Sequence, residues 1–225
     1  MKERLQVKIC GVTQKENAVA CVREDIQLIG LNFYAPSPRA VSLHQAEDIV
    51  AAIRREAPEI RVVGVFVNED PEVIQQIGCA LSLDGVQLSG DEDWEQVAAF
   101  GGWAYRALRP RTRHDLKQAF DAVQDMPIPC PGLPQLLVDG WTPDQYGGTG
   151  QTVSDWVLQV ARDQSRRWML AGGVTPDNVG ERLSQARPWG VDVASGVESG
   201  HPGIKDIHRV RALVQKIRQW EERYQ

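Results

Sequence analysis

The chain has 225 residues, of which 42% are hydrophobic and 24% are charged, and its formal net charge at pH 7 is −5. This length supports one large α/β domain or two small ones, and the negative charge argues against a nucleic-acid or anionic-membrane surface. No apolar run has the length of a transmembrane helix and the first residues do not form a signal peptide, so we expect a cytoplasmic protein with no membrane partner.

Apolar runs and helix-start signals alternate along the chain. The predicted strands are residues 7–10, 26–34, 61–67, 83–88, 103–108, 134–139, 168–170 and 190–193. A predicted helix follows each strand: these helices begin after Thr13, after Ser42, after Asp70 and at Thr175-Pro176, cover about 91–100, 115–123 and 153–161, and begin again at about 206. Thr13 with Glu16, and Ser42 with Gln45, predict capping boxes, while Asp70-Pro71 combines a cap with a first-turn proline.

Eight strand-then-helix units of this kind predict an α/β fold in which parallel strands are joined by right-handed crossovers. They close most simply into a (β/α)₈ TIM barrel. An open doubly wound sheet is the alternative, but no GxGxxG follows the first strand. Because no Pro/Ser linker or low-complexity segment divides the chain, we expect a single barrel domain over residues 1–225.

The cysteines do not have the spacing of a metal site. Cys10, Cys21, Cys79 and Cys130 include no CxxC pair and no His-linked zinc pattern. We therefore expect reduced thiols and no metal ligands.

Two residues at predicted strand ends carry groups that can transfer protons. Cys10 ends the first strand and Asp139 ends the sixth, so in a barrel both would lie at the mouth where catalytic residues gather, across from each other. Gly140 gives Asp139 a flexible exit that suits a carboxyl facing a pocket, although Asp139 could also cap a turn. Taken alone, Cys10 fits an inert buried thiol better than a base.

Glycines are concentrated in the loops after the last three predicted strands. These loops contain Gly147-Gly148-Thr149-Gly150, Ala171-Gly172-Gly173 and Ala194-Ser195-Gly196. Glycines allow backbone N–H groups to approach a phosphate, and a short helix starting at Ser195-Gly196 would add its positive end. One such loop alone would indicate only a tight turn, but three on the side where barrels bind phosphate favour a phosphate site.

Two further sets of charged residues are predicted to lie near the mouth of the barrel. Arg39 follows Pro38 on a stiff loop and is either a pre-positioned anion ligand or an ordinary surface charge. Strand alternation places Lys8 on the same face as Cys10, inside the barrel. Asp192 is the lone charge of the neighbouring eighth strand, so we hypothesise a Lys8–Asp192 pair beneath Cys10 that favours the Cys10 thiolate.

Blocks of sequence throughout the chain resemble the signature blocks of the phosphoribosylanthranilate isomerase family of tryptophan biosynthesis. The family is a metal-free and cofactor-free (β/α)₈ barrel, and the resemblance runs in order from residue 8 to Lys205-Asp206. The blocks are Lys8-Ile9-Cys10-Gly11-Val12-Thr13, Ser37-Pro38-Arg39, Gly64-Val65-Phe66-Val67-Asn68, Val86-Gln87-Leu88, Gly147-Gly148-Thr149-Gly150, residues 170–179 and residues 191–198.

The resemblance implies an Amadori rearrangement of N-(5′-phosphoribosyl)anthranilate to 1-(2-carboxyphenylamino)-1-deoxyribulose 5-phosphate. Asp139 then resembles the general acid that opens the ribose ring, and Cys10 the general base that removes the C2′ proton. Arg39 resembles the residue that holds the anthranilate group. Gly148, Thr149, Gly150, Gly172, Gly173, Ser195 and Gly196 resemble the site for the phosphate of this small phosphoribosyl substrate. A monomer and a homodimer are both compatible with the sequence.

Three positions depart from the family pattern. Ser89 stands where the family usually has His, Ala194 where Ser is common, and Gly140 where Ala or Ser is usual. The arginine-containing segment 103–110 also fits the family poorly. Ser89 removes an imidazole near the mouth, which bears on rate or substrate fit but leaves the acid–base pair in place.

Two alternative functions remain open from the sequence. The related aminoaldose-phosphate isomerase of histidine biosynthesis would be expected to carry Asp in place of Cys10 and phosphate loops in both halves of the barrel. A catalytically silent barrel that binds a phosphorylated metabolite would explain Ser89, but the joint presence of Cys10, Arg39 and Asp139 argues against it.

Overall fold

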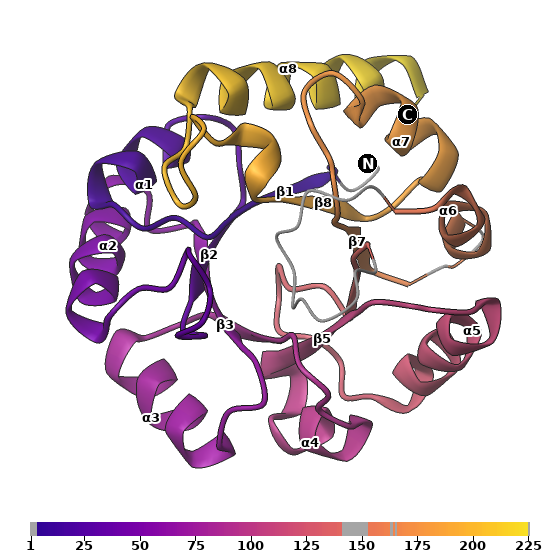
Figure 1. Cartoon of the computed structure of the whole chain (residues 1–225), viewed down its shortest axis with the longest axis horizontal. Helices are drawn as coiled ribbons and strands as arrows, with labels where there is room; N and C mark the ends of the chain where they lie inside the picture. Colours follow the sequence, from indigo (N-terminus) through magenta and orange to yellow (C-terminus); the bar gives the residue numbers. More distant parts are fainter. Residues whose placement is uncertain (1–3, 141–152, 163, 165, 225) are drawn as a thin grey trace.

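The computed structural model describes residues 4–140, 153–162, 164 and 166–224, in which eight parallel strands form a closed barrel surrounded by helices (Figure 1). The strands are β1 (Gln6–Cys10), β2 (Leu28–Asn32), β3 (Arg61–Phe66), β4 (Gly85–Leu88), β5 (Ala104–Leu108), β6 (Leu136–Val138), β7 (Trp168–Leu170) and β8 (Gly190–Val193). The helices are α1 (Lys15–Val22), α2 (Leu43–Glu56), α3 (Pro71–Leu81), α4 (Trp94–Ala99), α5 (Arg113–Ala122), α6 (Asp155–Arg162), α7 (Val179–Ala186) and α8 (Ile207–Tyr224).

The pairing of β1 with β8 closes the ring. Each strand pairs with the next in chain order, and Lys8 of β1 is in register with Asp192 of β8. The predicted (β/α)₈ fold is therefore confirmed, and the open-sheet alternative is wrong. That residues 1–225 make up a single domain stays a prediction.

Strand alternation divides the apolar side chains between two layers. One set faces outwards and packs against the helices, as with Phe120 of α5 against Trp168 of β7. The other set fills the barrel interior and includes Leu28, Tyr105, Leu137 and Met169. The interior is therefore a packed core rather than a pore.

Two of the predicted helix-start signals, at Ser42 and at Asp70, are confirmed, and the caps predicted at Thr13 and at Thr175 are wrong. Ser42 and Gln45 form the predicted capping box of α2, and Asp70 caps α3 ahead of Pro71. The capping box predicted at Thr13 does not form, because the Thr13 hydroxyl donates instead to the Gly203 carbonyl, 3.0 Å away, in the loop before α8. Helix α7 begins at Val179, because Thr175 and Asn178 exchange hydrogen bonds in a turn that precedes it.

Candidate active site

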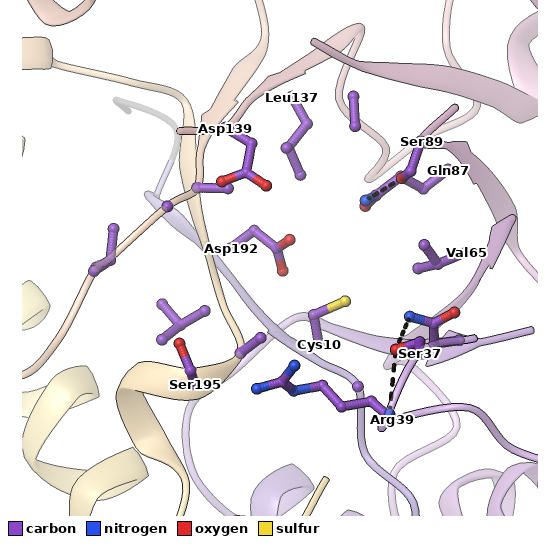
Figure 2. Close-up of a pocket in the computed structure, with 18 of the residues that line it drawn as sticks. Cys10, Ser37, Arg39, Val65, Gln87, Ser89, Leu137, Asp139, Asp192 and Ser195 are labelled. Carbon is purple, nitrogen blue, oxygen red and sulfur yellow. Dashed lines mark hydrogen bonds between the residues drawn. The ribbon is translucent and has the colours of Figure 1, made fainter. Parts of the chain in front are cut away.

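The C-terminal ends of the strands surround a pocket at the mouth of the barrel (Figure 2). The pocket encloses about 850 Å³ when the space open to solvent is included. Among its lining residues are the predicted site residues Cys10, Arg39, Asp139, Gly172, Gly173, Asp192, Ser195 and Gly196. The structure thus brings together residues up to 186 positions apart in the chain, from Cys10 to Gly196.

Cys10 is the last residue of β1, and its thiol projects into the pocket (Figure 2). Gly30 on β2 makes room for it, because a Cβ at that position would lie 2.7 Å from the Cys10 Sγ. Burial raises the pKa of the thiol and the Asp192 carboxylate raises it further, while Lys8 and Lys205 lower it by less. In the ligand-free protein at neutral pH, Cys10 is therefore mainly a protonated thiol.

Asp139 directly follows β6, where its N–H donates to the Leu108 carbonyl of β5 at 2.8 Å. Its Oδ1 accepts a hydrogen bond of 2.7 Å from the Gly140 N–H. Burial and the nearby Asp192 outweigh this bond and the charges of Arg109 and Lys8, so the pKa of Asp139 is raised to about 6. A carboxyl with this pKa can carry a proton near neutral pH and release it again.

Lys8 and Asp192 form the ion pair that strand alternation suggested. The Lys8 Nζ lies 3.2 Å from Asp192 Oδ1 and 2.8 Å from Gln87 Oε1, and Lys8 is fully buried. Tyr105 donates to the same Gln87 oxygen at 3.1 Å. Asp192 itself borders the pocket, and in the view of Figure 2 it lies between Cys10 and Asp139.

The predicted pair forms, but that it favours the Cys10 thiolate stays a prediction, because burial is the largest cause of the raised thiol pKa, Asp192 raises that pKa and Lys8 lowers it. The positive charge of Lys8 is balanced by Asp192, and Asp192 disfavours a second negative charge on Cys10. The pair fixes the floor of the pocket, while the net pKa shift of the thiol is upwards.

Arg39 contacts a carboxylate that sequence reasoning did not single out. Its Nε and Nη2 donate to the two oxygens of Glu198, both at 2.7 Å, and Arg39 is 8% exposed. Lys205 donates to the same Glu198 at 2.9 Å. Burial alone would raise the pKa of Glu198, but Arg39, Lys205 and the Gly203 N–H together lower it to about 2. This loop pairing leaves no periodic signal in the sequence, which is why it was missed.

The glycines after β7 and β8 give the pocket a wall made of backbone. Gly172 and Gly173 have positive φ angles of 83° and 61°, which side-chain-bearing residues rarely adopt. A Cβ on Gly196 would lie 1.9 Å from the Val174 carbonyl oxygen, so only glycine fits there. Ser195 opens a short 3₁₀ turn, Ser195–Val197, on the same wall. The predicted phosphate-site residues Gly148, Thr149 and Gly150 lie outside the described residues.

Ser89 and Arg109 complete the opposite wall. The Ser89 Oγ accepts a hydrogen bond of 3.0 Å from Gln87 Nε2, and Arg109 Nη2 donates to the Ser89 carbonyl at 2.8 Å. Gln87 and Arg109 were not predicted as site residues. Strand alternation could have found both, since Gln87 and Ser89 share one face of β4 and Arg109 continues the inner face of Tyr105 and Ala107.

Within residues 4–140, 153–162, 164 and 166–224, no group of three or more His, Cys, Asp or Glu side chains could hold a metal ion. No helix of this described part is long and apolar enough to cross a membrane.

Comparison with known proteins gives a consistent result. The model of the N-(5′-phosphoribosyl)anthranilate isomerase family matches residues 7–216. The chain is 42% identical over 224 residues to the isomerase of that name from Myxococcus xanthus, covering 96% of this chain and 99% of the relative. It is 40% identical over 214 residues to the Pseudomonas aeruginosa isomerase, covering 95% of each.

Solved structures agree. The crystal structure of phosphoribosyl anthranilate isomerase from Thermotoga maritima superposes with a TM-score of 0.82 at 30% identity and covers 96% of this chain and 99% of its own. A second structure of an isomerase of this kind, in complex with reduced 1-(o-carboxyphenylamino)-1-deoxyribulose 5-phosphate, has a TM-score of 0.78 at 28% identity, with the same coverage. The chain therefore belongs to the N-(5′-phosphoribosyl)anthranilate isomerase family.

Proposed function

We propose that this protein isomerises N-(5′-phosphoribosyl)anthranilate to 1-(2-carboxyphenylamino)-1-deoxyribulose 5-phosphate, as a cytoplasmic enzyme of tryptophan biosynthesis. Membership of the family supports the reaction, and one related structure holds a reduced form of this product. The observation that carries the proposal is that a thiol, Cys10, and a carboxyl, Asp139, face one pocket from β1 and from the end of β6.

In the first step Asp139 acts as general acid. Its carboxyl proton goes to the ribose ring oxygen while the C1′–O4′ bond breaks, and the anthranilate nitrogen lone pair forms a C1′=N double bond. The products are the Asp139 carboxylate and an open-chain protonated Schiff base. A pKa of about 6 keeps the acid strong enough to donate and basic enough to be protonated again.

In the second step the Cys10 thiolate acts as general base. It takes the proton from C2′, and the electrons of that C–H bond form C1′=C2′ and neutralise the iminium nitrogen. The resulting enolamine becomes the amino ketose when C1′ gains a proton and the C2′ hydroxyl loses one. The whole sequence transfers protons and shifts electron pairs within the substrate, so it needs no oxidant or reductant, and the substrate and product have the same composition.

We assign the two charged ends of the substrate to two different parts of the pocket wall. We assign the phosphate to the backbone wall formed by Gly172, Gly173, Ser195 and Gly196, where N–H groups can approach an anion. We assign the anthranilate to the side of Arg39, whose guanidinium is held in place by Glu198. Gly148, Thr149 and Gly150 remain predicted phosphate ligands.

The protonation states set a condition on this mechanism. With the pKa of Asp139 at about 6 and that of Cys10 raised, the prevailing form at pH 7 pairs a carboxylate with a thiol. The reactive form pairs a carboxyl with a thiolate. Both forms hold the same number of protons, so the reactive form is a minor tautomer that needs one proton to move from Cys10 to Asp139.

The decisive experiment follows the fluorescence of freshly prepared phosphoribosylanthranilate with the wild type, Cys10→Ser and Asp139→Asn. Each substitution should reduce kcat by roughly 10²-fold or more, the usual contribution of a positioned acid or base. Cys79→Ser is the matched control, since Cys79 is an exposed thiol on α3, and it should retain wild-type activity. Full activity in both site variants would contradict the proposed roles.

A further inference from the structure

Arg109 lines the pocket but has no role in the two proton transfers of the proposed mechanism. It follows the last residue of β5, and β5 pairs with β6 so that Leu108 is in register with Val138. The next residues along these strands are Arg109 and Asp139, and both line the pocket. The hydrogen bond from the Asp139 N–H to the Leu108 carbonyl, 2.8 Å long, holds the two strand ends together at this point.

Side-chain alternation turns Arg109 towards the same space as Asp139. Tyr105 reaches Gln87 inside the barrel and Ala107 lines the pocket, so Arg109, the residue after β5, continues this inward-facing alternation. Leu137 and Asp139 line the same pocket at the end of β6. Arg109 and Asp139 therefore line the same end of the barrel, close enough for the charge of Arg109 to act on the Asp139 carboxyl.

A main-chain contact limits where the guanidinium can lie. Arg109 Nη2 donates to the Ser89 carbonyl at 2.8 Å, and Ser89 directly follows β4. The short Ser89 side chain is bound by Gln87 and occupies little of the mouth. The strand ends of β4, β5 and β6 thus present a serine, an arginine and an aspartate in a row, at the place where the family usually has an imidazole on the first of them.

The charges around Asp139 come from three strands. Asp192 on β8 raises the pKa of Asp139, whereas Arg109 after β5 and Lys8 on β1 lower it. Lys8 is already paired with Asp192 and bound to Gln87, so the effects of these two charges on Asp139 largely oppose each other. Arg109 is then the charge whose removal changes the balance most directly.

We propose that Arg109 is a positioning residue that acts through Asp139: its guanidinium, held by the Ser89 carbonyl, stabilises the Asp139 carboxylate and so makes Asp139 a stronger proton donor. The inference rests on the proposed function, because it takes Asp139 as the general acid. It assigns a role to the arginine-containing segment of β5, which is where this chain departs from the family pattern.

The test compares three variants. Arg109→Gln removes the charge but keeps an N–H that can donate to the Ser89 carbonyl, Arg109→Lys keeps the charge, and Arg111→Gln changes an exposed arginine two residues further along. The Asp139 carboxyl is titrated by ¹³C NMR in the ligand-free protein, with its signal assigned by its absence in Asp139→Asn. This readout does not depend on activity.

In Arg109→Gln the titration midpoint of Asp139 should rise from about 6 by roughly 0.5 to 1 unit, the effect of one nearby charge reduced by solvent in an open pocket. Arg109→Lys and Arg111→Gln should stay close to the wild type. The acid limb of kcat/KM should move with the titration midpoint.

An unchanged midpoint in Arg109→Gln would overturn the inference. If, in addition, that variant lowered kcat/KM by one factor at every pH, Arg109 would be a ligand of a substrate anion instead. If the Asp139 midpoint shifted in Arg109→Gln but Asp139→Asn stayed active, Arg109 would act on the carboxyl while Asp139 would not be the general acid. Failure of the inference and failure of the proposed function therefore give different results.

Discussion

Glu198 and Asp139 are carboxyl groups at the mouth of the same barrel, and their surroundings differ in how many cations contact them. Glu198, on the side of β8 and β2, receives two hydrogen bonds from Arg39 and one from Lys205, and its pKa falls to about 2. Asp139, after β6, receives a hydrogen bond from the Gly140 N–H and lies near Asp192, and its pKa rises to about 6.

In the proposed mechanism, this difference separates a structural carboxylate, Glu198, from a reactive carboxyl, Asp139. A proton leaves Glu198 at a pH far below the physiological range, so Glu198 is a permanent anion that holds Arg39 and Lys205 in place. Asp139 can exchange its proton near neutrality because the protein does not fully compensate its negative charge. In the proposed mechanism, the Asp139 side of the mouth is therefore reactive because its negative charge is not fully compensated, and the Glu198 side holds Arg39 rigidly for binding.

Glu198→Gln should disrupt the ion pairs of Glu198 with Arg39 and Lys205 and, among the proposed variants, should have the largest effect on stability. It leaves Arg39 and the buried Lys205 without their counter-charge, and an uncompensated buried charge is strongly destabilising. We expect a loss of about 3 kcal/mol in the free energy of unfolding, measured by urea denaturation, and an increase in KM because Arg39 is no longer aligned. The control is Glu56→Gln, which removes the exposed ion pair with Arg23 and should leave the free energy of unfolding unchanged. If both variants lost the same free energy of unfolding, the special role of Glu198 would be contradicted.

The pH dependence of kcat/KM tests the reactive side. Below about pH 6, Asp139 and Cys10 are both protonated and the base is missing, so activity should fall roughly tenfold for each pH unit. At high pH both are ionised and the acid is missing; because burial raises the pKa of Cys10, this limb should lie above the usual thiol value of about 8.5. An alkaline limb near pH 7 would show instead that the thiolate is stabilised in the free enzyme.

Asp139→Asn should change stability in the direction opposite to Glu198→Gln. The pKa of Asp139 is about 6 in the folded protein and about 3.9 in an unfolded chain, so ionising it above pH 6 destabilises the fold, and this penalty disappears as the pH falls below about 4. With a discount for its contact with solvent, the amide should stabilise the protein by about 1 to 2 kcal/mol at pH 7 and by little at pH 4. Denaturant unfolding at both pH values measures this, and destabilisation at pH 7 would contradict it.

Glu198 should show the converse dependence on pH in the wild type. Its pKa is lower in the folded protein, about 2, than in an unfolded chain, about 4.3. The stabilisation it provides is present above about pH 4.3 and is lost as the pH falls towards 2.

The sequence predicts those parts of the site that follow from strand geometry. Alternation and the adjacency of the first and last strands in a closed barrel were enough to pair Lys8 with Asp192, and strand order was enough to bring Cys10 and Asp139 to one mouth. The Arg39–Glu198 contact joins two loops 159 residues apart, and no repeat in the sequence encodes the path of a loop. The capping box at Thr13 failed for a related reason: a contact with Gly203 outweighed the local signal.

Ser89→Ala gives the smallest expected effect and refines the comparison on the reactive side. The substitution removes the Ser89 Oγ, which accepts a 3.0 Å hydrogen bond from Gln87 Nε2. The Oε1 of the same Gln87 amide accepts a hydrogen bond from Lys8. Because the site borders an open pocket, water can replace the hydroxyl, and we expect a loss of about 1 kcal/mol in the free energy of unfolding and less than a tenfold change in kcat/KM. The two quantities are measured by urea denaturation and steady-state kinetics. A loss of activity above roughly 10²-fold with unchanged stability would mean that the Ser89 hydroxyl contacts the reacting atoms, and that this position contributes directly to catalysis even without an imidazole.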